Sequence, residues 1–338
     1  QLMASVCDNL VIHPNVVNAS DINEMPANAL YIEGSVLCRL IMGTVGIQPV
    51  RANQVLVLLH PHPDRVFTDL AVNAVNAARS SYGLNCPRVI EMDRPLVMRP
   101  DYTGSERAAG SVESFENLCY LLDKYREEYD AIAIASVIST PLHYYSDYFW
   151  SDGDMVNPWG GVESMLTHTI SSMYDLPSAH APMLESQAVL DIETGVVDPR
   201  MAAEVISVSF LQCVLKGLQR SPKIIRDPEA MRDPGVLTAR DISCLVIPDG
   251  CLGLPTFAAL EQGIPVIAVR ENVNLMKNDL EALPWASGQL HIVDNYWEAA
   301  GVLSAIRTGI EPSAARRPLR SILLEQTPTS LPMPEQLH

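Results

Sequence analysis

The chain has 338 residues, of which 48% are hydrophobic and 19% charged, a composition that excludes intrinsic disorder and fits a globular protein. Forty acidic residues against 23 basic ones give a formal charge of −17, and no Lys/Arg run occurs, which argues against nucleic acid or an anionic membrane as partner. Seven scattered cysteines without Cys-x-x-Cys spacing argue against a disulfide framework or a zinc cluster and favour a reducing compartment.

The length and the apolar runs predict how the chain is organised. A chain of this size exceeds one ordinary core, so we expect an α/β lobe over residues 1–150 and a second lobe, or a continuation of the same sheet, over residues 151–325. A Pro-rich tail follows over residues 326–338. The opening residues lack the pattern of a signal peptide and the longest apolar runs are strand-sized, so we expect a cytoplasmic protein without membrane contact.

In the first half of the chain, short apolar runs alternate with helical spacing. Strands are predicted at residues 28–33, 54–59, 88–92 and 130–138, and amphipathic helices at residues 67–78 and 112–125. Residues 140–161 are rich in Tyr, Trp, Asp and Gly and are predicted to form a long loop, the kind of loop that often carries function.

The second half continues the alternation. The longest helix is predicted from Asp198, as N-cap, to about Gly217. Strands follow at residues 244–247, 265–269 and 291–293, with helices at residues 256–262 and 297–307. This order predicts an α/β fold with a mainly parallel, Rossmann-like sheet flanked by helices, arranged in one or two lobes. In such sheets ligands bind at the carboxyl ends of the strands.

The segment from Cys244 to Asn272 carries the strongest local signal for a binding site. A buried strand leads through a glycine-rich loop into a helix, where backbone N–H groups can hold a carboxylate or phosphate. The loop residues that we assign to ligand binding are Asp249, Gly250, Gly253 and Thr256. The alternative is a tight turn that needs glycine for its geometry alone. Cys251 is a candidate nucleophile because a helix N-terminus lowers a thiol pKa, although a small buried thiol is the simpler interpretation.

Other polar residues follow predicted strands. His13 comes directly after Val11 and Ile12, in a stretch whose Asn and Asp residues equally predict turns. His180 lies in a strand of small residues, and Glu271 follows the strand at residues 265–269. We hypothesise that His180 and Glu271 converge as a general acid–base pair.

Several familiar sites are absent or weak. His60, His62 and Asp64 have chelating spacing, but each His precedes Pro in an obvious turn, so we assign no metal site. No G-x-S-x-G, H-E-x-x-H, Walker A or G-x-G-x-x-G motif occurs, so no cofactor is expected either.

Two local resemblances concern the Cys244–Asn272 segment. Its strand, Cys loop and helix are similar to those of two-lobed amino-acid racemases and maleate isomerases. Its "PDG…PT…" rhythm is similar to that of nucleotide-sugar glycosyltransferases with two Rossmann domains. Neither resemblance extends beyond this region.

One resemblance covers nearly the whole chain. The segments HPNVVNASD, NALYIEG, SAHAP, DPRMAAE and IPVIAVREN occur in this order and resemble a domain of unknown function found mainly in photosynthetic bacteria and plants. Members of that family begin with an extra strand and a glycine-rich loop that this chain lacks, and they lack the His60/His62 pair. The family pattern highlights His13, Asn15, Asn28, Tyr31, Glu33, Gly34, His180, Pro182, Gly253, Pro255, Glu271 and Asn272.

These observations lead to one functional hypothesis and two alternatives. We expect a cofactor-independent enzyme of the isomerase, lyase or hydrolase type that acts on a small carboxylate-bearing metabolite and forms a homo-oligomer. Its anionic ligand would lie on the Gly250–Thr256 loop, with His180 and Glu271 as acid–base groups and His13 and Asn15 orienting the substrate. The alternatives are a glycosyl- or nucleotide-transferring enzyme that binds phosphate at the same loop, and a non-catalytic metabolite-binding regulatory protein.

Overall fold

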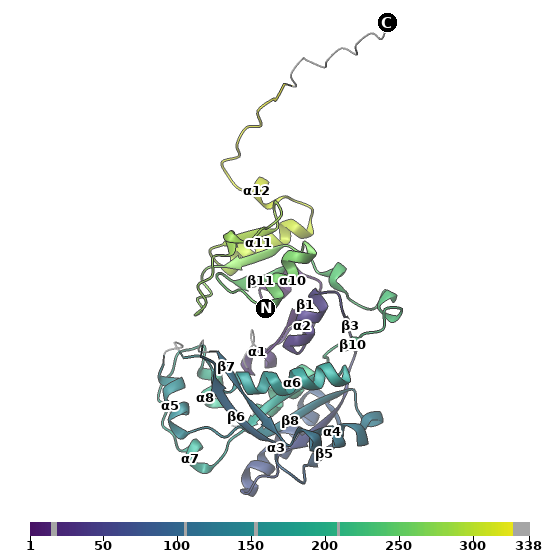
Figure 1. Cartoon of the computed structure of the whole chain (residues 1–338), viewed down its shortest axis with the longest axis vertical. Helices are drawn as coiled ribbons and strands as arrows, with labels where there is room; N and C mark the ends of the chain where they lie inside the picture. Colours follow the sequence, from purple (N-terminus) through teal and green to yellow (C-terminus); the bar gives the residue numbers. More distant parts are fainter. Residues whose placement is uncertain (15–18, 105–106, 152–154, 208–209, 327–338) are drawn as a thin grey trace.

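The computed structural model describes residues 1–14, 19–104, 107–151, 155–207 and 210–326. It is a mixed α/β structure in which two parallel sheets, one of four strands and one of three, are flanked by helices. Figure 1 shows the three-stranded sheet with α11 towards one end of the molecule, the four-stranded sheet with α6 towards the other, and β1 and α2 between them.

The four-stranded sheet has the order β5-β4-β8-β9, with all neighbours parallel. Its two central strands are continuous apolar runs because helices cover both of their faces. The strand order reverses between β4 and β8, so the carboxyl ends of these two strands form a topological switch point. The strands are β4 (Gln54–Leu59), β5 (Asn85–Glu91), β8 (Ala131–Val137) and β9 (Ser178–Met183).

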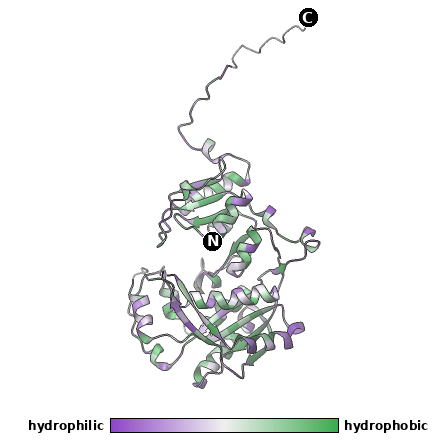
Figure 2. Cartoon of the chain, in the orientation of Figure 1, coloured by the Kyte–Doolittle hydropathy of each residue, from purple (hydrophilic) through white to green (hydrophobic). Residues whose placement is uncertain are grey.

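Each face of this sheet has its own core. On one face Val55, Val57 and Leu59 pack against α3 (Arg65–Tyr82) and α9 (Leu211–Leu218). On the other face Leu56 and Leu58 pack against α4 (Phe115–Lys124) and α6 (Gly160–Tyr174). An antiparallel hairpin of β6 (Val97–Tyr102) and β7 (Ala108–Glu113) also contacts α6. In Figure 2 the green, hydrophobic residues concentrate on the strands of the two parallel sheets.

The three-stranded sheet has the order β11-β12-β13 and is also parallel. Its strands are β11 (Leu245–Pro248), β12 (Val266–Val269) and β13 (Leu290–Val293). One core joins it to α2 (Gly34–Ile41) and α10 (Leu254–Gln262), and a second core joins its other face to α11 (Tyr296–Arg307).

We use the word lobe for each parallel sheet together with the helices that pack on it, and a two-stranded parallel ribbon contributes side chains to the cores of both. It consists of β1 (Leu10–Ile12) and β2 (Ala29–Tyr31). Alternate side chains point to opposite faces of a strand. Ala29 and Tyr31 therefore join the core beneath the four-stranded sheet, while Leu30 joins the core of the three-stranded sheet.

The remaining elements are short. Two further strands, β3 (Gly46–Gln48) and β10 (Lys223–Ile225), form an antiparallel pair. The small helices are η1 (Met3–Val6), α1 (Ala19–Asn23), α7 (Gln187–Leu190), α12 (Pro312–Ala315) and the 3-10 turns η2 (Arg126–Glu128), η3 (Ala230–Arg232), η4 (Ala239–Asp241) and η5 (Leu280–Ala282). No helix within the described ranges is both long enough and apolar enough to cross a bilayer.

The predicted strands and helices of the two sheets are confirmed, but two predictions for the middle of the chain are wrong. The expected loop at residues 140–161 contains α5 (Leu142–Trp150) and the start of α6. The expected long helix from Asp198 is instead divided into α8 (Ala202–Ile206) and α9. Asp198 does accept the Arg200 backbone N–H, at 2.8 Å, but the backbone is extended at Ser207 and α8 ends there. The four-stranded sheet includes β9 and so extends past the expected boundary at residue 150, while the separate three-stranded sheet lies wholly within residues 151–325. Most of the expected Pro-rich tail lies outside the described residues.

Candidate functional site

Glu33 and His168 form an ion pair between the end of β2 and α6. Glu33 also caps α2, because its Oε2 accepts hydrogen bonds from the Ser35 backbone N–H, at 2.9 Å, and from the Ser35 hydroxyl. The Glu33 side chain is only 2% exposed, whereas that of His168 is 46% exposed. Burial acts to raise the pKa of Glu33, but the hydrogen bonds from His168 and Ser35 outweigh it and hold that pKa below its usual range. An ionised carboxylate thus fixes the Nδ1 side of a histidine that reaches solvent.

His13 lies beside this pair, directly after β1. A Cβ placed on Gly34 would be 3.5 Å from Cε1 of His168 and 3.9 Å from Nδ1 of His13, so both imidazoles flank this glycine. Burial lowers the pKa of His13; the charge of Glu33 opposes that shift and the charge of His168 adds to it. The parallel pairing of β1 with β2 therefore brings His13 and Glu33 to one edge, as parallel strands do at their carboxyl ends.

A second chain of hydrogen bonds begins at another residue of α6, Glu163. Nδ1 of His180 is 2.8 Å from Oε1 of Glu163, and Nε2 of His180 is 2.8 Å from Oγ of Ser136. Because Glu163 accepts at Nδ1, Nε2 of a neutral His180 accepts the Ser136 hydroxyl proton. Ser136 comes from β8 and His180 from β9, at adjacent positions of the sheet face that α6 covers.

Tyr31 and Glu204 link these groups electrostatically. Burial raises the pKa of Tyr31, and the charges of Glu163 and Glu33 raise it further. Burial also raises the pKa of Glu204; a hydrogen bond from Tyr148 opposes this shift and the charge of Glu163 adds to it. We call the nine residues around this helix the α6 cluster: His13, Tyr31, Glu33, Ser136, Tyr148, Glu163, His168, His180 and Glu204.

The three-stranded sheet carries a separate depression at the carboxyl ends of β11 and β12. Its volume is about 390 Å³, and the expected ligand-binding residues Asp249, Gly250 and Asn272 line it together with Arg270 and Lys277. The loop is held by amide side chains, since Asn274 donates to the Asp249 carbonyl at 2.8 Å and Asn278 to that of Gly250 at 3.0 Å. Gly250 has φ +76°, and a Cβ there would lie 2.9 Å from the Met276 carbonyl oxygen, so glycine is required by both conformation and space.

Other residues of the predicted anion loop have local structural roles. Gly253 is the N-cap of α10, and the buried Thr256 donates its hydroxyl to the Cys251 carbonyl at 3.2 Å. Burial raises the pKa of the Cys251 thiol, the opposite of what a thiolate nucleophile requires. None of these three residues lines the described depression.

The expected pairing of His180 with Glu271 is replaced by other contacts. Oε1 of Glu271 accepts the Tyr296 backbone N–H at 2.7 Å, where α11 begins, while His180 is bonded to Glu163 and Ser136. The two residues belong to different sheets, because the strand before Glu271 pairs with β11 and β13 and not with β9. Asn28 lies apart from the cluster and donates to the carbonyls of Ala4 and Cys7, at 2.8 and 3.0 Å. Asn15 lies outside the described residues.

The histidines of the His60–Asp64 turn have structural surroundings. Nδ1 of His62 accepts the Asp64 backbone N–H at 2.9 Å and its Nε2 lies 3.1 Å from the Leu184 carbonyl oxygen. Burial and the charge of His62 lower the pKa of His60 to about 4. Within the part of the chain that the structure describes, no group of three or more His, Cys, Asp or Glu residues is arranged to hold a metal ion.

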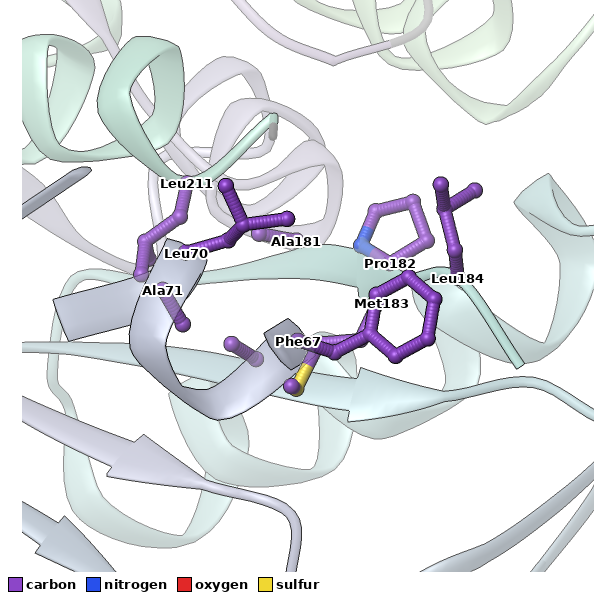
Figure 3. Close-up of a pocket in the computed structure, with 9 residues that line it drawn as sticks. Phe67, Leu70, Ala71, Ala181, Pro182, Met183, Leu184 and Leu211 are labelled. Atoms are coloured by element: carbon purple, nitrogen blue, oxygen red, sulfur yellow. The ribbon is translucent and has the colours of Figure 1, made fainter. Parts of the chain in front are cut away.

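A small cavity between α3, β9 and α9 is too apolar for chemistry. Its volume is about 20 Å³, roughly the space of one water molecule. Figure 3 shows its lining as carbon and sulfur side chains, including Phe67, Met183 and Leu211. It is therefore a packing gap in the core.

The sequence did not reveal Glu163, His168, Ser136, Tyr148 or Glu204 as site residues. The available signal was on α6, where Glu163, Thr167 and Ser171 recur at four-residue spacing and include two buried polar side chains. A polar stripe that faces a sheet core must be matched by polar partners, here His180 and Ser178.

The fold and this cluster define a mixed α/β protein in which two histidine–carboxylate pairs, each with one buried and one partly exposed member, lie around one helix. The chain belongs to the family described as "Protein of unknown function (DUF3326)", whose model matches residues 1–316. This confirms the resemblance inferred from the five sequence segments. The chain is similar to an uncharacterised lipoprotein of Synechococcus, with 28% identity over 314 residues that cover 92% of this chain and 85% of the relative. No solved structure matches the chain.

Proposed function

We propose that the protein is a cofactor-independent enzyme that acts on a small carboxylate-bearing metabolite by acid–base chemistry, with His168 as the proton-transferring group. The observation that supports this proposal is the Glu33–His168 pair. A carboxylate bonded to one ring nitrogen sets the tautomer and orientation of the imidazole, and the other nitrogen is then the one that exchanges a proton with a substrate. The half-exposed His168 side chain meets the requirement of access.

The neighbours of His168 are compatible with a carboxylate substrate. His13 lies next to the pair and can donate a hydrogen bond to a carboxylate, whereas the Ser35 N–H at the start of α2 is already taken by Glu33. Burial lowers the pKa of His13 and so favours its neutral form, which both donates and accepts hydrogen bonds. Isomerase, lyase and hydrolase reactions all use such a group.

The test combines ligand screening with one substitution. Thermal shift against dicarboxylates, amino acids and sugar nucleotides selects ligands, and NMR of each compound incubated with the protein detects turnover. We expect a carboxylate to be turned over by the wild type, and His168→Ala to bind it equally well while losing about 100-fold or more in kcat. His143→Ala, which changes a histidine on α5, is the matched control and retains wild-type kcat.

Two other results would change the assignment. Unchanged turnover in His168→Ala refutes the role of His168. If the wild type binds a carboxylate without turning it over, and His168→Ala no longer binds it, the metabolite-binding regulatory protein is favoured instead.

A second candidate function is supported by the depression at the carboxyl ends of β11 and β12. Under this alternative the sheets are Rossmann-like and the protein transfers a glycosyl or nucleotide group, with the ligand's phosphate near Arg270 and Lys277. Arg270 already pairs with Asp294, at 2.8 Å, which leaves Lys277 as the stronger candidate for phosphate. A thermal shift by sugar nucleotides, but by no carboxylate of the panel, would favour this function.

A further inference from the structure

The two His–Glu pairs of the α6 cluster share one arrangement with the residue types exchanged. In the first pair the α6 residue is His168, 46% exposed, and its partner Glu33 is 2% exposed. In the second pair the α6 residue is Glu163, 25% exposed, and its partner His180 is 1% exposed. In both pairs, therefore, a buried residue holds a partly exposed proton-carrying group on the same helix.

The Ser136–His180–Glu163 chain runs in the opposite direction to that of a serine hydrolase. In those enzymes the hydroxyl is exposed as the nucleophile and the carboxylate lies buried behind the histidine. Here Ser136 is fully buried, with its hydroxyl 3.2 Å from Sδ of Met98, and Glu163 is the exposed end. Ser136 has no access to a substrate, so the group that this chain presents is the carboxylate of Glu163.

We propose that Glu163 is a second proton-transferring residue of the same reaction, and that His180 and Ser136 are positioning residues that fix its carboxylate. This inference rests on the function proposed above. One of the two α6 groups takes a proton from the substrate while the other supplies one, so the proton count balances without a cosubstrate.

The surroundings of Glu163 agree with this role. Tyr148 and Glu204 lie near it on α5 and α8, and Tyr31 on β2 is close enough to both Glu163 and Glu33 to sense their charges. Tyr31 therefore lies electrostatically between the two pairs. Glu163 and His168 are five residues apart on α6. That is about 140° around a helix, so they can approach a substrate from different directions.

The experiment measures kcat and KM with the carboxylate that wild-type protein turns over in the panel. We expect Glu163→Gln to lower kcat by about 100-fold or more with KM within about threefold, because Gln keeps the shape but cannot take up or release a proton. His180→Leu should lower kcat by at least about tenfold, and His180→Asn should restore most of it because its amide N–H lies near the position of Nδ1. His62→Gln changes another buried histidine, one whose ring bonds only to backbone, and controls for loss of stability.

A second measurement reports the positioning without turnover. In protein labelled with ¹⁵N-histidine, the Nδ1–H proton of His180 should give a slowly exchanging signal. The substitution Glu163→Gln should change the chemical shift of this signal, whereas Ser136→Ala should leave the signal observable. Absence of that signal in the wild type overturns the positioning role. Wild-type kcat in Glu163→Gln, with His168→Ala inactive, overturns this inference but leaves the proposed function intact. Full activity of His168→Ala overturns the proposed function itself.

Discussion

Glu204 is a single residue whose ionised form the fold disfavours. Burial and the charge of Glu163 both raise its pKa, against the hydrogen bond from Tyr148. A carboxyl group whose pKa is higher in the folded state stabilises the fold below its ordinary value near 4.5, and this stabilisation is lost as the pH rises through the folded pKa. At neutral pH a charge at this position therefore lowers the stability of the folded state.

We predict that Glu204→Gln raises Tm by about 1–3 °C at neutral pH, because the amide keeps polar contacts without the charge. The difference from wild type should shrink to about zero towards pH 4, where the carboxyl group is protonated in both states. Scanning fluorimetry between about pH 4 and pH 8 measures it. Glu261→Gln, at an exposed position on α10, should follow the wild-type pH profile. A constant offset at every pH would show that the charge of Glu204 is not responsible.

The residues of the α6 cluster also show what the sequence could reveal about the site. His13 was identified because it follows a short strand, and Tyr31 and Glu33 were highlighted by the family resemblance. His13 and Glu33 do lie beside His168. The partners of His168 and His180 could not be identified in this way. Pairing of Glu163 with His180 depends on how α6 crosses the sheet, and that crossing is set by packing between segments distant in sequence.

At the scale of elements, two glycines set how closely α6 approaches the β6–β7 hairpin. A Cβ on Gly161 would lie 2.4 Å from the backbone of Ala108 and Ala109, and a Cβ on Gly110 would lie 2.7 Å from Cβ of Val162. No neighbour there is the end of a flexible side chain, so the helix itself has to move. Because Glu163 is two residues beyond Gly161, this contact also sets its position.

We predict that Gly161→Ala lowers the free energy of unfolding by about 1–3 kcal/mol, the usual cost of overpacking. Gly301→Ala is the matched control. Gly301 lies inside α11 with no atom within 4 Å of an added Cβ, so alanine there should stabilise the protein by about 0.5–1 kcal/mol through helix propensity. Urea denaturation of both variants separates the two effects. Equal stability of both would mean that the α6–hairpin contact is loose.

The elements differ in how well their sequences predict them. The strands β4, β8 and β12 are continuous apolar runs buried on both faces, so they can be recognised from this one sequence. The helix α6 was missed because Glu163, Thr167 and Ser171 break the apolar face that normally marks a helix. The β6–β7 hairpin was missed because its strands are partly exposed and lack a regular apolar alternation.

At the scale of the whole molecule, the β1–β2 ribbon is the part that belongs to both lobes. Ile12 and Tyr31 lie in the core under the four-stranded sheet, and Leu30 and Ile32 lie in the core of the three-stranded sheet. Successive side chains of a strand point to opposite faces, so this ribbon joins two cores that would otherwise be separate. The Glu33–His168 pair follows directly from this ribbon, so the candidate site depends on both lobes being folded.

We predict that Leu30→Ala destabilises both lobes together. The substitution deletes a buried side chain from the second core, at a cost of about 2–4 kcal/mol, and it also loosens the ribbon that carries Tyr31 into the first core. Hydrogen exchange measured by mass spectrometry should therefore show faster exchange in both β8 and β12.

Val302→Ala is the control. Val302 belongs to α11 and lies in the core on the face of the three-stranded sheet away from the ribbon. It should speed exchange in β12 far more than in β8, because local openings stay within one cooperative unit. If Leu30→Ala leaves β8 protected, the lobes are independent, and an acid–base site built from β2 and α6 would have to be held by the four-stranded lobe alone.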